Sequence, residues 1–175
     1  WKKRIGAAKR QALEVADDLI SAYVQRRKAS SSMFVSDSKM EASFIADFKY
    51  KDTKDQTIVW NEIKRDLESS TPMDRLVCGD VGFGKTELSI RATFLAAING
   101  KKTLILAPTT ILANQLFNSF NDRLSPYGVV CGCLTRLTKK TTAKNLVENY
   151  VKGTADVLVA THKAIFNEQV LKKSS

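Results

Sequence analysis

An eight-residue segment near the middle of the chain constrains its fold more than any other feature. Residues 79–86 read GDVGFGKT and match the pattern G-x-x-x-x-G-K-[ST] at every fixed position. A short apolar run at residues 75–79 predicts a buried strand before the segment, and residues 85–98 predict a helix after it. Glycines at such a turn let backbone N–H groups and the helix N-terminus face an anion. The segment therefore predicts a phosphate-binding loop between a strand and a helix.

The last two residues of this loop are the predicted catalytic residues. Lys85 is expected to reach the β- and γ-phosphates of a nucleotide as a point charge. Thr86 offers a hydroxyl to Mg²⁺, which prefers oxygen ligands in near-octahedral geometry. The loop thus predicts a nucleotide bound together with Mg²⁺, with Thr86 as the metal ligand.

Helices and strands are predicted to alternate along the rest of the chain. We expect helices at residues 53–67, 110–124 and 139–151, and strands at residues 103–107, 129–134 and 156–160. Strands that alternate with helices are typical of βαβ units and a parallel sheet, with ligands at the carboxyl ends of the strands. The predicted fold class is α/β, a phosphate-loop NTPase sheet with flanking helices.

Three segments are predicted along the chain. Residues 1–28 form a basic connecting helix whose thin, Ala-rich stripe is expected to pack on the body of the protein. Residues 29–52 are a linker with an aromatic lead-in, and residues 53–175 are a partial nucleotide-binding domain. The first residue is not Met, so we expect the sequence to begin inside a longer protein.

The chain has a formal net charge of +10 over 175 residues, which favours polyanionic partners. No apolar run approaches the length of a membrane span, and no signal peptide is recognisable, so a cytoplasmic protein is expected. Cys78 is predicted to be buried in its strand. Cys131 and Cys133 share one face of a strand, where reduced core thiols are favoured over a metal site because no further ligands lie near them in the sequence.

Gln56 has two interpretations that the local sequence leaves open. It is the fourth residue of Thr53-Lys54-Asp55-Gln56, which reads as a capping box. Its side-chain amide could instead read adenine, which needs both a donor and an acceptor, while Phe48 stacks on the base.

Several segments together resemble the bacterial transcription-repair coupling factors, the Mfd family. The resemblance covers residues 72–87 around the phosphate loop, and residues 48–56, which are similar to the family's adenine-reading Q motif. Residues 107–115, 134–136 and 160–163 resemble three DNA-contacting motifs of superfamily 2 helicases. Residues 15–19 and 23–26 resemble the family's segment between its polymerase-binding domain and its motor.

The resemblance implies the first RecA-like motor domain of a double-stranded DNA translocase that removes stalled RNA polymerase during transcription-coupled DNA repair. In such a protein, other domains would engage the polymerase and excision-repair proteins. The residues implied to hold Mg-ATP are Phe48, Gln56, Gly79, Asp80, Val81, Gly82, Phe83, Gly84, Lys85, Thr86 and Glu87. The residues implied to lie near the DNA backbone are Pro108, Thr109, Thr135, Arg136, Thr161 and His162.

Related motors use an Asp-Glu pair, the Walker B motif, to hold Mg²⁺ and orient water, and this sequence contains no adjacent Asp-Glu. We therefore expect the chain alone to bind ATP and to hydrolyse little of it. The alternatives are a fragment of a RecG-like helicase, a small-molecule P-loop kinase, and a non-catalytic module that docks a partner through residues 2–28.

Overall fold

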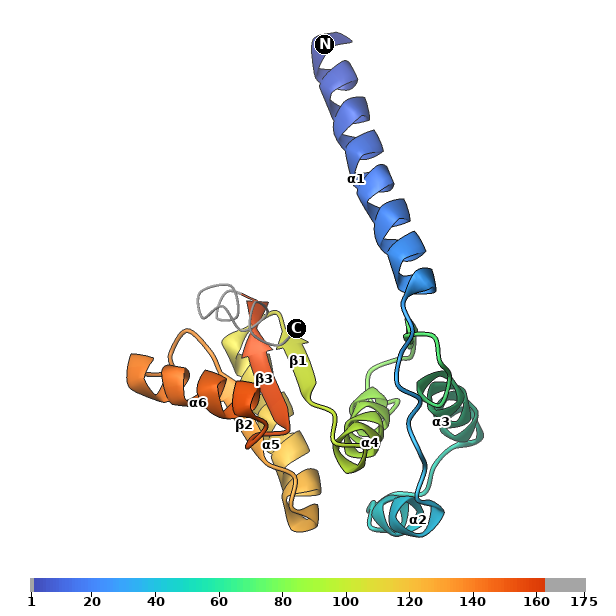
Figure 1. Ribbon diagram of the computed structural model, residues 1–175, viewed down its shortest axis with the longest axis vertical. Coiled ribbons are helices and arrows are strands. Elements are labelled where there is room, and N and C mark those ends of the chain that lie inside the picture. The colour runs from blue at the N-terminus through green and yellow to red at the C-terminus, as the bar shows by residue number, and fades with distance from the viewer. Residues whose placement is uncertain (1, 163–175) are drawn as a thin grey trace.

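A computed structural model describes residues 2–162 of the chain (Figure 1). The helices are α1 (Lys2–Lys28), α2 (Ser38–Ala46), α3 (Lys54–Leu67), α4 (Lys85–Ile98), α5 (Thr110–Leu124) and α6 (Lys140–Lys152), with a 3-10 turn η1 (Ser125–Tyr127). The strands are β1 (Thr103–Ala107), β2 (Cys131–Leu134) and β3 (Val157–Thr161). All predicted helices and three of the four predicted strands are confirmed within two residues at each boundary. Helix α2 was not predicted and lies inside the expected linker.

The three strands form one parallel sheet in the order β1-β3-β2. All five residues of the central strand β3 are buried, as expected for a parallel strand covered on both faces. Its side chains alternate between two cores, because successive residues of a strand point to opposite faces. Val157 and Val159 belong to one core, and Leu158 and Ala160 to the other. The α/β fold class predicted from the sequence is therefore confirmed.

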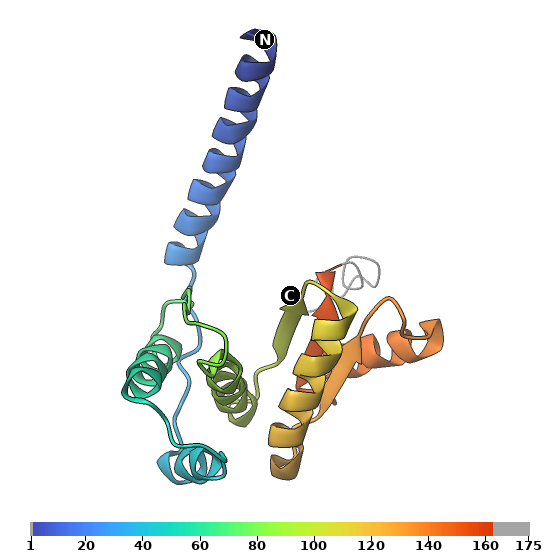
Figure 2. The ribbon, with the colours of Figure 1, turned by 180° about the vertical axis from the view of Figure 1, so that it is seen from behind.

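Helices α5 and α6 cover opposite faces of the sheet, as the two opposite views show (Figures 1 and 2). Helix α6 packs Ala143, Val147 and Tyr150 against one face. Helix α5 packs Phe120 and Leu124 against the other, together with residues of α2 and α4. The sheet thus lies between two helical layers.

Helix α4 joins the sheet to the N-terminal helices. Its side chains Ile90 and Phe94 enter the core on the α5 side of the sheet, and Leu88 packs with Trp60 and Ile63 of α3. Phe94 also stacks on Phe44 of α2, with ring centroids 4.0 Å apart and an interplanar angle of 4°. One helix therefore anchors two hydrophobic clusters.

Helix α1 projects away from the rest of the molecule in both views (Figures 1 and 2). Among its described side chains, which begin at Leu13, only Arg26 is partly buried, and it pairs with Asp74. The expectation that α1 packs on the body of the protein is wrong over this stretch. Large apolar side chains in this stretch, such as Leu19 and Ile20, are exposed.

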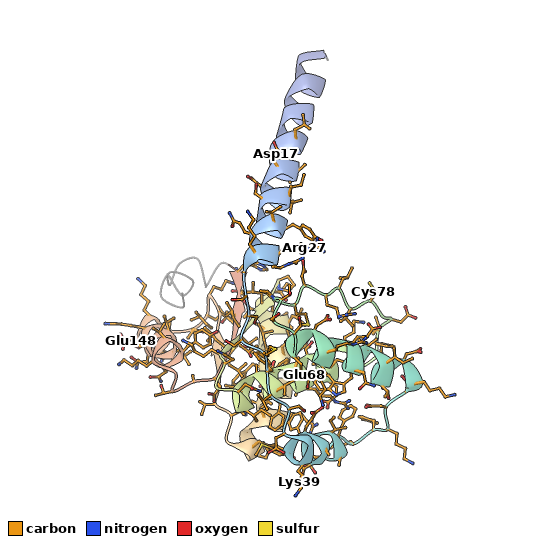
Figure 3. All side chains as sticks on the ribbon, turned by 45° about the vertical axis from the view of Figure 1, so that its right-hand side comes forward. Asp17, Arg27, Lys39, Glu68, Cys78 and Glu148 are labelled. Carbon is orange, nitrogen blue, oxygen red and sulfur yellow. The ribbon has the colours of Figure 1, made fainter. Side chains whose placement is uncertain are left out.

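The predicted strand at residues 75–79 does not form, and Cys78 is exposed rather than buried (Figure 3). A strand needs a neighbour that supplies N–H and C=O groups. Within the described part of the chain, β1 and β2 each pair only with β3, and Arg75 is drawn to α3 by ion pairs with Glu62 and Asp66. The run is apolar, but Leu76 is 87% exposed.

No helix among the described residues is both long enough and apolar enough to cross a membrane.

A buried carboxylate joins α2 to α3. Glu41 accepts hydrogen bonds from Lys64 Nζ at 2.7 Å, Ser36 Oγ at 2.5 Å and Trp60 Nε1 at 3.3 Å. Burial raises the pKa of Glu41, but the hydrogen bond and charge of Lys64, with the other two donors, hold this pKa below its ordinary value.

We predict that Glu41→Gln lowers the free energy of unfolding by about 1–3 kcal/mol at pH 7, because it removes charge-assisted hydrogen bonds from a buried site. The pKa of Glu41 is lowered on folding, so its stabilising contribution is present above the ordinary glutamate pKa and is lost as pH falls through the folded-state value. Urea unfolding at several pH values should therefore show the difference in unfolding free energy between the two proteins shrinking as pH falls below the ordinary glutamate pKa of about 4.3. Glu148→Gln is the control, because the Glu148 side chain is 43% exposed and its ion-pair partner, Lys144, lies on the surface of α6. An equal loss of unfolding free energy in this control, or a difference between wild type and Glu41→Gln that persists in acid, would contradict the assignment.

Candidate nucleotide and nucleic-acid sites

The phosphate loop adopts the backbone that its glycines permit. Gly82 and Gly84 both have φ of 85°, in the left-handed region where residues with a side chain are strained. Gly84 is the N-cap of α4 and provides no side-chain cap, so the first N–H groups of the helix have no side-chain cap partner. An anion at this end of α4 would also be favoured by the helix dipole.

Lys85 lies folded across the loop. Its Nζ donates to the carbonyl oxygens of Gly79 at 2.5 Å and Asp80 at 2.7 Å. Thr86 is exposed, as are Asp80 and Val81. The ammonium group therefore already lies over the loop, although the strand expected to precede the loop is absent from the described structure.

The side chain of Gln56 closes the predicted capping box and also reaches the loop. Its Oε1 accepts from the backbone N–H of Thr53 at 2.8 Å, and its own N–H donates to Thr53 Oγ1 at 3.2 Å. Its Nε2 donates to the carbonyl of Phe83 at 2.5 Å. The capping interpretation is confirmed, and adenine reading by the same amide stays a prediction.

A cavity of about 380 Å³ brings the aromatic lead-in and the phosphate loop together. Its lining residues are Phe48, Tyr50, Lys51, Thr53, Gln56, Gly82 and Gly84. Sequence reasoning named Phe48, Gln56 and the two glycines for the nucleotide site. It missed Tyr50 and Lys51, and it named Thr53 only as part of the capping box. The aromatic pair two residues apart was the available signal, and the two rings now meet edge to face with centroids 5.5 Å apart.

Beside this cavity lies a group of paired charges, two of them buried, that the sequence did not predict. Arg91 is 2% exposed and pairs with Asp52 and with Glu87. Glu87 also pairs with Arg123 of α5 at 3.0 Å. Glu87 was grouped with the nucleotide-binding residues, and the structure instead directs its carboxylate to these two arginines. Its contact with a nucleotide stays a prediction.

A second cavity, of about 430 Å³, lies at the carboxyl end of the sheet. It is lined by the last residue of β3 and by residues that follow the three strands, namely Pro108, Thr109, Thr110, Ile111, Arg136, Thr161 and His162. Five of the six residues predicted to lie near nucleic acid therefore meet here, because parallel strands end at the same edge. Thr109 also caps α5, its Oγ1 accepting from the N–H of Leu112 at 3.2 Å.

The sixth predicted residue, Thr135, does not line this cavity. It is buried, and its Oγ1 accepts from the backbone N–H of Leu137 at 3.3 Å inside a turn. This turn positions the neighbouring Arg136, which is exposed. Sequence reasoning missed Ile111, which is 73% exposed at the rim of the cavity.

Cys131 and Cys133 are half-buried on one face of β2, as predicted. Burial raises the pKa of the Cys131 thiol to about 11, with a smaller effect from Asp156, and burial raises the pKa of Cys133 as well. Neither thiol belongs to a metal-binding cluster within residues 2–162. Both side chains pack against the core on the α5 side of the sheet, and their reduced state stays a prediction.

A parallel sheet between helices, a glycine-rich loop at the start of α4 and a second cavity at the strand ends together define a RecA-like α/β domain of the helicase class. The chain belongs to the DEAD/DEAH box helicase family, which it matches over residues 53–174.

The chain is also similar to curated transcription-repair-coupling factors. It is 38% identical to the protein of Bacillus subtilis over 98% of this chain, and 36% identical to that of Myxococcus xanthus over 99%. It spans only 15% and 14% of the length of these two relatives. Among solved structures, RecG bound to a three-way DNA junction superposes with a TM-score of 0.78 at 28% identity, covering 84% of this chain and 20% of RecG.

The two loop glycines make a matched pair for testing the contact between Gln56 and the phosphate loop. A Cβ at Gly84 would lie 2.5 Å from Gln56 Nε2, whereas a Cβ at Gly82 would meet nothing within 4 Å. Substitution of either glycine by Ala should lower the free energy of unfolding by about 1–2 kcal/mol, because alanine is strained in the left-handed backbone conformation. Gly84→Ala should cost about 1 kcal/mol more, because Gln56 must give up hydrogen bonds to move.

Thermal unfolding of the two variants measures this difference. In a Gln56→Ala background the extra cost of Gly84→Ala should vanish, because the obstructing amide is gone. A difference that survives this background would place its origin elsewhere in the loop.

Proposed function

We propose that this chain is the ATP-binding part of a double-stranded DNA translocase that acts in transcription-coupled repair. The observation that carries the proposal is the pairing of two cavities on one RecA-like domain, one beside the phosphate loop and one at the strand ends. Identity of 34–38% to transcription-repair-coupling factors, against 28% to RecG, favours the coupling factors over a RecG-like helicase. The DEAD/DEAH box match disfavours a small-molecule kinase.

In this proposal Mg-ATP binds with its phosphates on the loop at the start of α4. The backbone N–H groups of residues 79–84 hold the phosphates, Lys85 turns from its carbonyl partners to the β- and γ-phosphates, and Thr86 ligates Mg²⁺. The base would enter the cavity beside Phe48 and Gln56. The carbonyls that now bind Lys85 are weaker partners for an ammonium group than phosphate is, so the exchange is favourable.

The second cavity would hold the DNA backbone. Arg136 supplies the positive charge, and the N-terminus of α5 adds N–H groups and a favourable dipole. Such contacts grip phosphates without reading bases, as translocation along any sequence requires. RNA polymerase and excision-repair proteins would be engaged by other parts of the whole protein.

A second candidate function is partner docking through α1. The helix projects from the body and exposes Leu13, Val15, Leu19, Ile20, Tyr23 and Val24. Binding of a protein partner that needs neither ATP nor DNA would favour this alternative.

We predict that the chain binds a fluorescent ATP analogue in the presence of Mg²⁺ and turns over little of it. Lys85→Ala should weaken binding by about tenfold or more, because it removes a charge-assisted contact to phosphate. Lys144→Ala, on the exposed face of α6, is the control. DNA-stimulated ATP hydrolysis by the chain alone, abolished by Lys85→Ala, would contradict the low-turnover part of the proposal.

We further predict that Arg136→Ala weakens binding to duplex DNA to the same extent for unrelated sequences. The slope of the logarithm of the DNA-binding constant against the logarithm of salt concentration should become shallower by about 1, which corresponds to the loss of one phosphate contact. Fluorescence anisotropy at several salt concentrations measures both effects, with Arg65→Ala on α3 as the matched control. Loss confined to one DNA sequence, or an equal loss with Arg65→Ala, would contradict a backbone contact at this cavity.

A further inference from the structure

A buried arginine joins the phosphate-loop helix to the loop that carries the aromatic residues. Arg91 of α4 donates through Nη1 to Asp52 Oδ2 at 2.6 Å and through Nη2 to Asp52 Oδ1 at 2.9 Å. Its Nε donates to Glu87 Oε1 at 3.1 Å. All three nitrogens of the guanidinium are engaged, and the two-pronged contact with Asp52 fixes direction as well as distance.

Both ends of this contact lie beside the candidate nucleotide cavity. Asp52 stands between Lys51 and Thr53, and both of these neighbours line the cavity. Arg91 lies on α4, whose first residues are Lys85 and Thr86 of the phosphate loop. The pair therefore joins the loop that forms one wall of the cavity to the helix that begins at the other wall.

The arginine also supports the aromatic residue of that wall. The guanidinium of Arg91 lies 5.5 Å from the ring centroid of Phe48, and that of Arg123 lies 5.6 Å from it. Arg123 is held in turn by Glu87. Phe48 thus lies within the range of favourable cation–π contact with the buried Arg91 and the half-buried Arg123. Ion pairs with Asp52 and Glu87 set the positions of these two cations.

Burying an arginine together with the carboxylate of Glu87 costs desolvation, and such groups contribute little net stability compared with apolar side chains of similar size. The same pairs do impose one geometry on the segments that they join. The nucleotide cavity needs one fixed arrangement of its two walls, because the walls come from segments far apart in the sequence.

We propose that Arg91 and Asp52 are positioning residues that set the loop of residues 48–53 against the phosphate loop, so that the nucleoside part of a bound nucleotide is held. This inference rests on the proposed nucleotide site. The Arg91–Asp52 pair would then contribute to the part of the ATP affinity that comes from the base and sugar, whereas Lys85 binds the phosphates.

The test compares two ligands on the full chain by isothermal titration with Mg²⁺: ATP, and inorganic tripolyphosphate, which lacks base and sugar. Asp52→Asn should weaken ATP binding by about tenfold, because a neutral amide cannot hold the arginine fork as a carboxylate does. It should leave tripolyphosphate binding within about twofold. Lys85→Ala should weaken the binding of both ATP and tripolyphosphate.

Two further variants keep the result interpretable. Arg91→Lys retains the charge but not the fork, so it should shift ATP affinity in the same direction as Asp52→Asn. Asp66→Asn is the matched control, because Asp66 also pairs with an arginine, Arg75 Nε at 2.6 Å, but lines neither wall of this cavity. Thermal unfolding of each variant confirms that the titrations are made on folded protein.

Equal weakening of ATP and tripolyphosphate by Asp52→Asn and Arg91→Lys would overturn the inference and indicate general damage to the loop. ATP binding unchanged by both variants would overturn it as well, while leaving the proposed function intact. If the unsubstituted chain binds tripolyphosphate as tightly as ATP, the base adds no affinity and the pair has nothing to position. A chain that binds neither ligand overturns the proposed function and this inference with it.

Discussion

The packing of α4 between two hydrophobic clusters is the interaction on which the rest of the structure depends. One face of the helix puts Ile90 and Phe94 into the core of the sheet, and Leu88 enters the cluster formed with α3. The helix is apolar over most of its length, which suits an element buried on several sides rather than one at the surface. Because the phosphate loop leads directly into α4, the place of the loop is set by this packing.

The same helix carries the polar contacts that organise the cavity. Glu87 and Arg91 are one turn apart and both are buried, which is tolerable only because each has partners of opposite charge. Those partners are Asp52, in the loop of residues 48–53, and Arg123, in α5. These charges thus link two segments, the loop of residues 48–53 and α5, to one helix, next to the loop where a nucleotide is proposed to bind.

The elements that could be predicted from the sequence are those whose structure depends on residues close by in the chain. Local rules were sufficient for every helix except α2, and the caps at Thr53 and Thr109 follow from short-range sequence. They failed at residues 75–79, because an apolar composition cannot supply the neighbouring strand on which a strand depends. They also failed for Thr135, whose hydroxyl oxygen accepts a hydrogen bond from the N–H of Leu137 within its own turn. They failed again for α1, which was expected to pack on the body of the protein but leaves its apolar residues exposed.

The sequence by itself determined the phosphate loop, the α/β class and the boundaries of every helix but α2, because these depend on glycine placement, periodicity and capping within a few residues. It also implied that the residues after the three strands would gather, since parallel strands end at one edge. Only the tertiary structure decided that Tyr50 and Lys51 line the nucleotide cavity, that Gln56 binds the carbonyl of Phe83, and that Arg91 meets Asp52. Each of these contacts joins residues whose approach depends on how whole helices pack, and no local pattern records that packing.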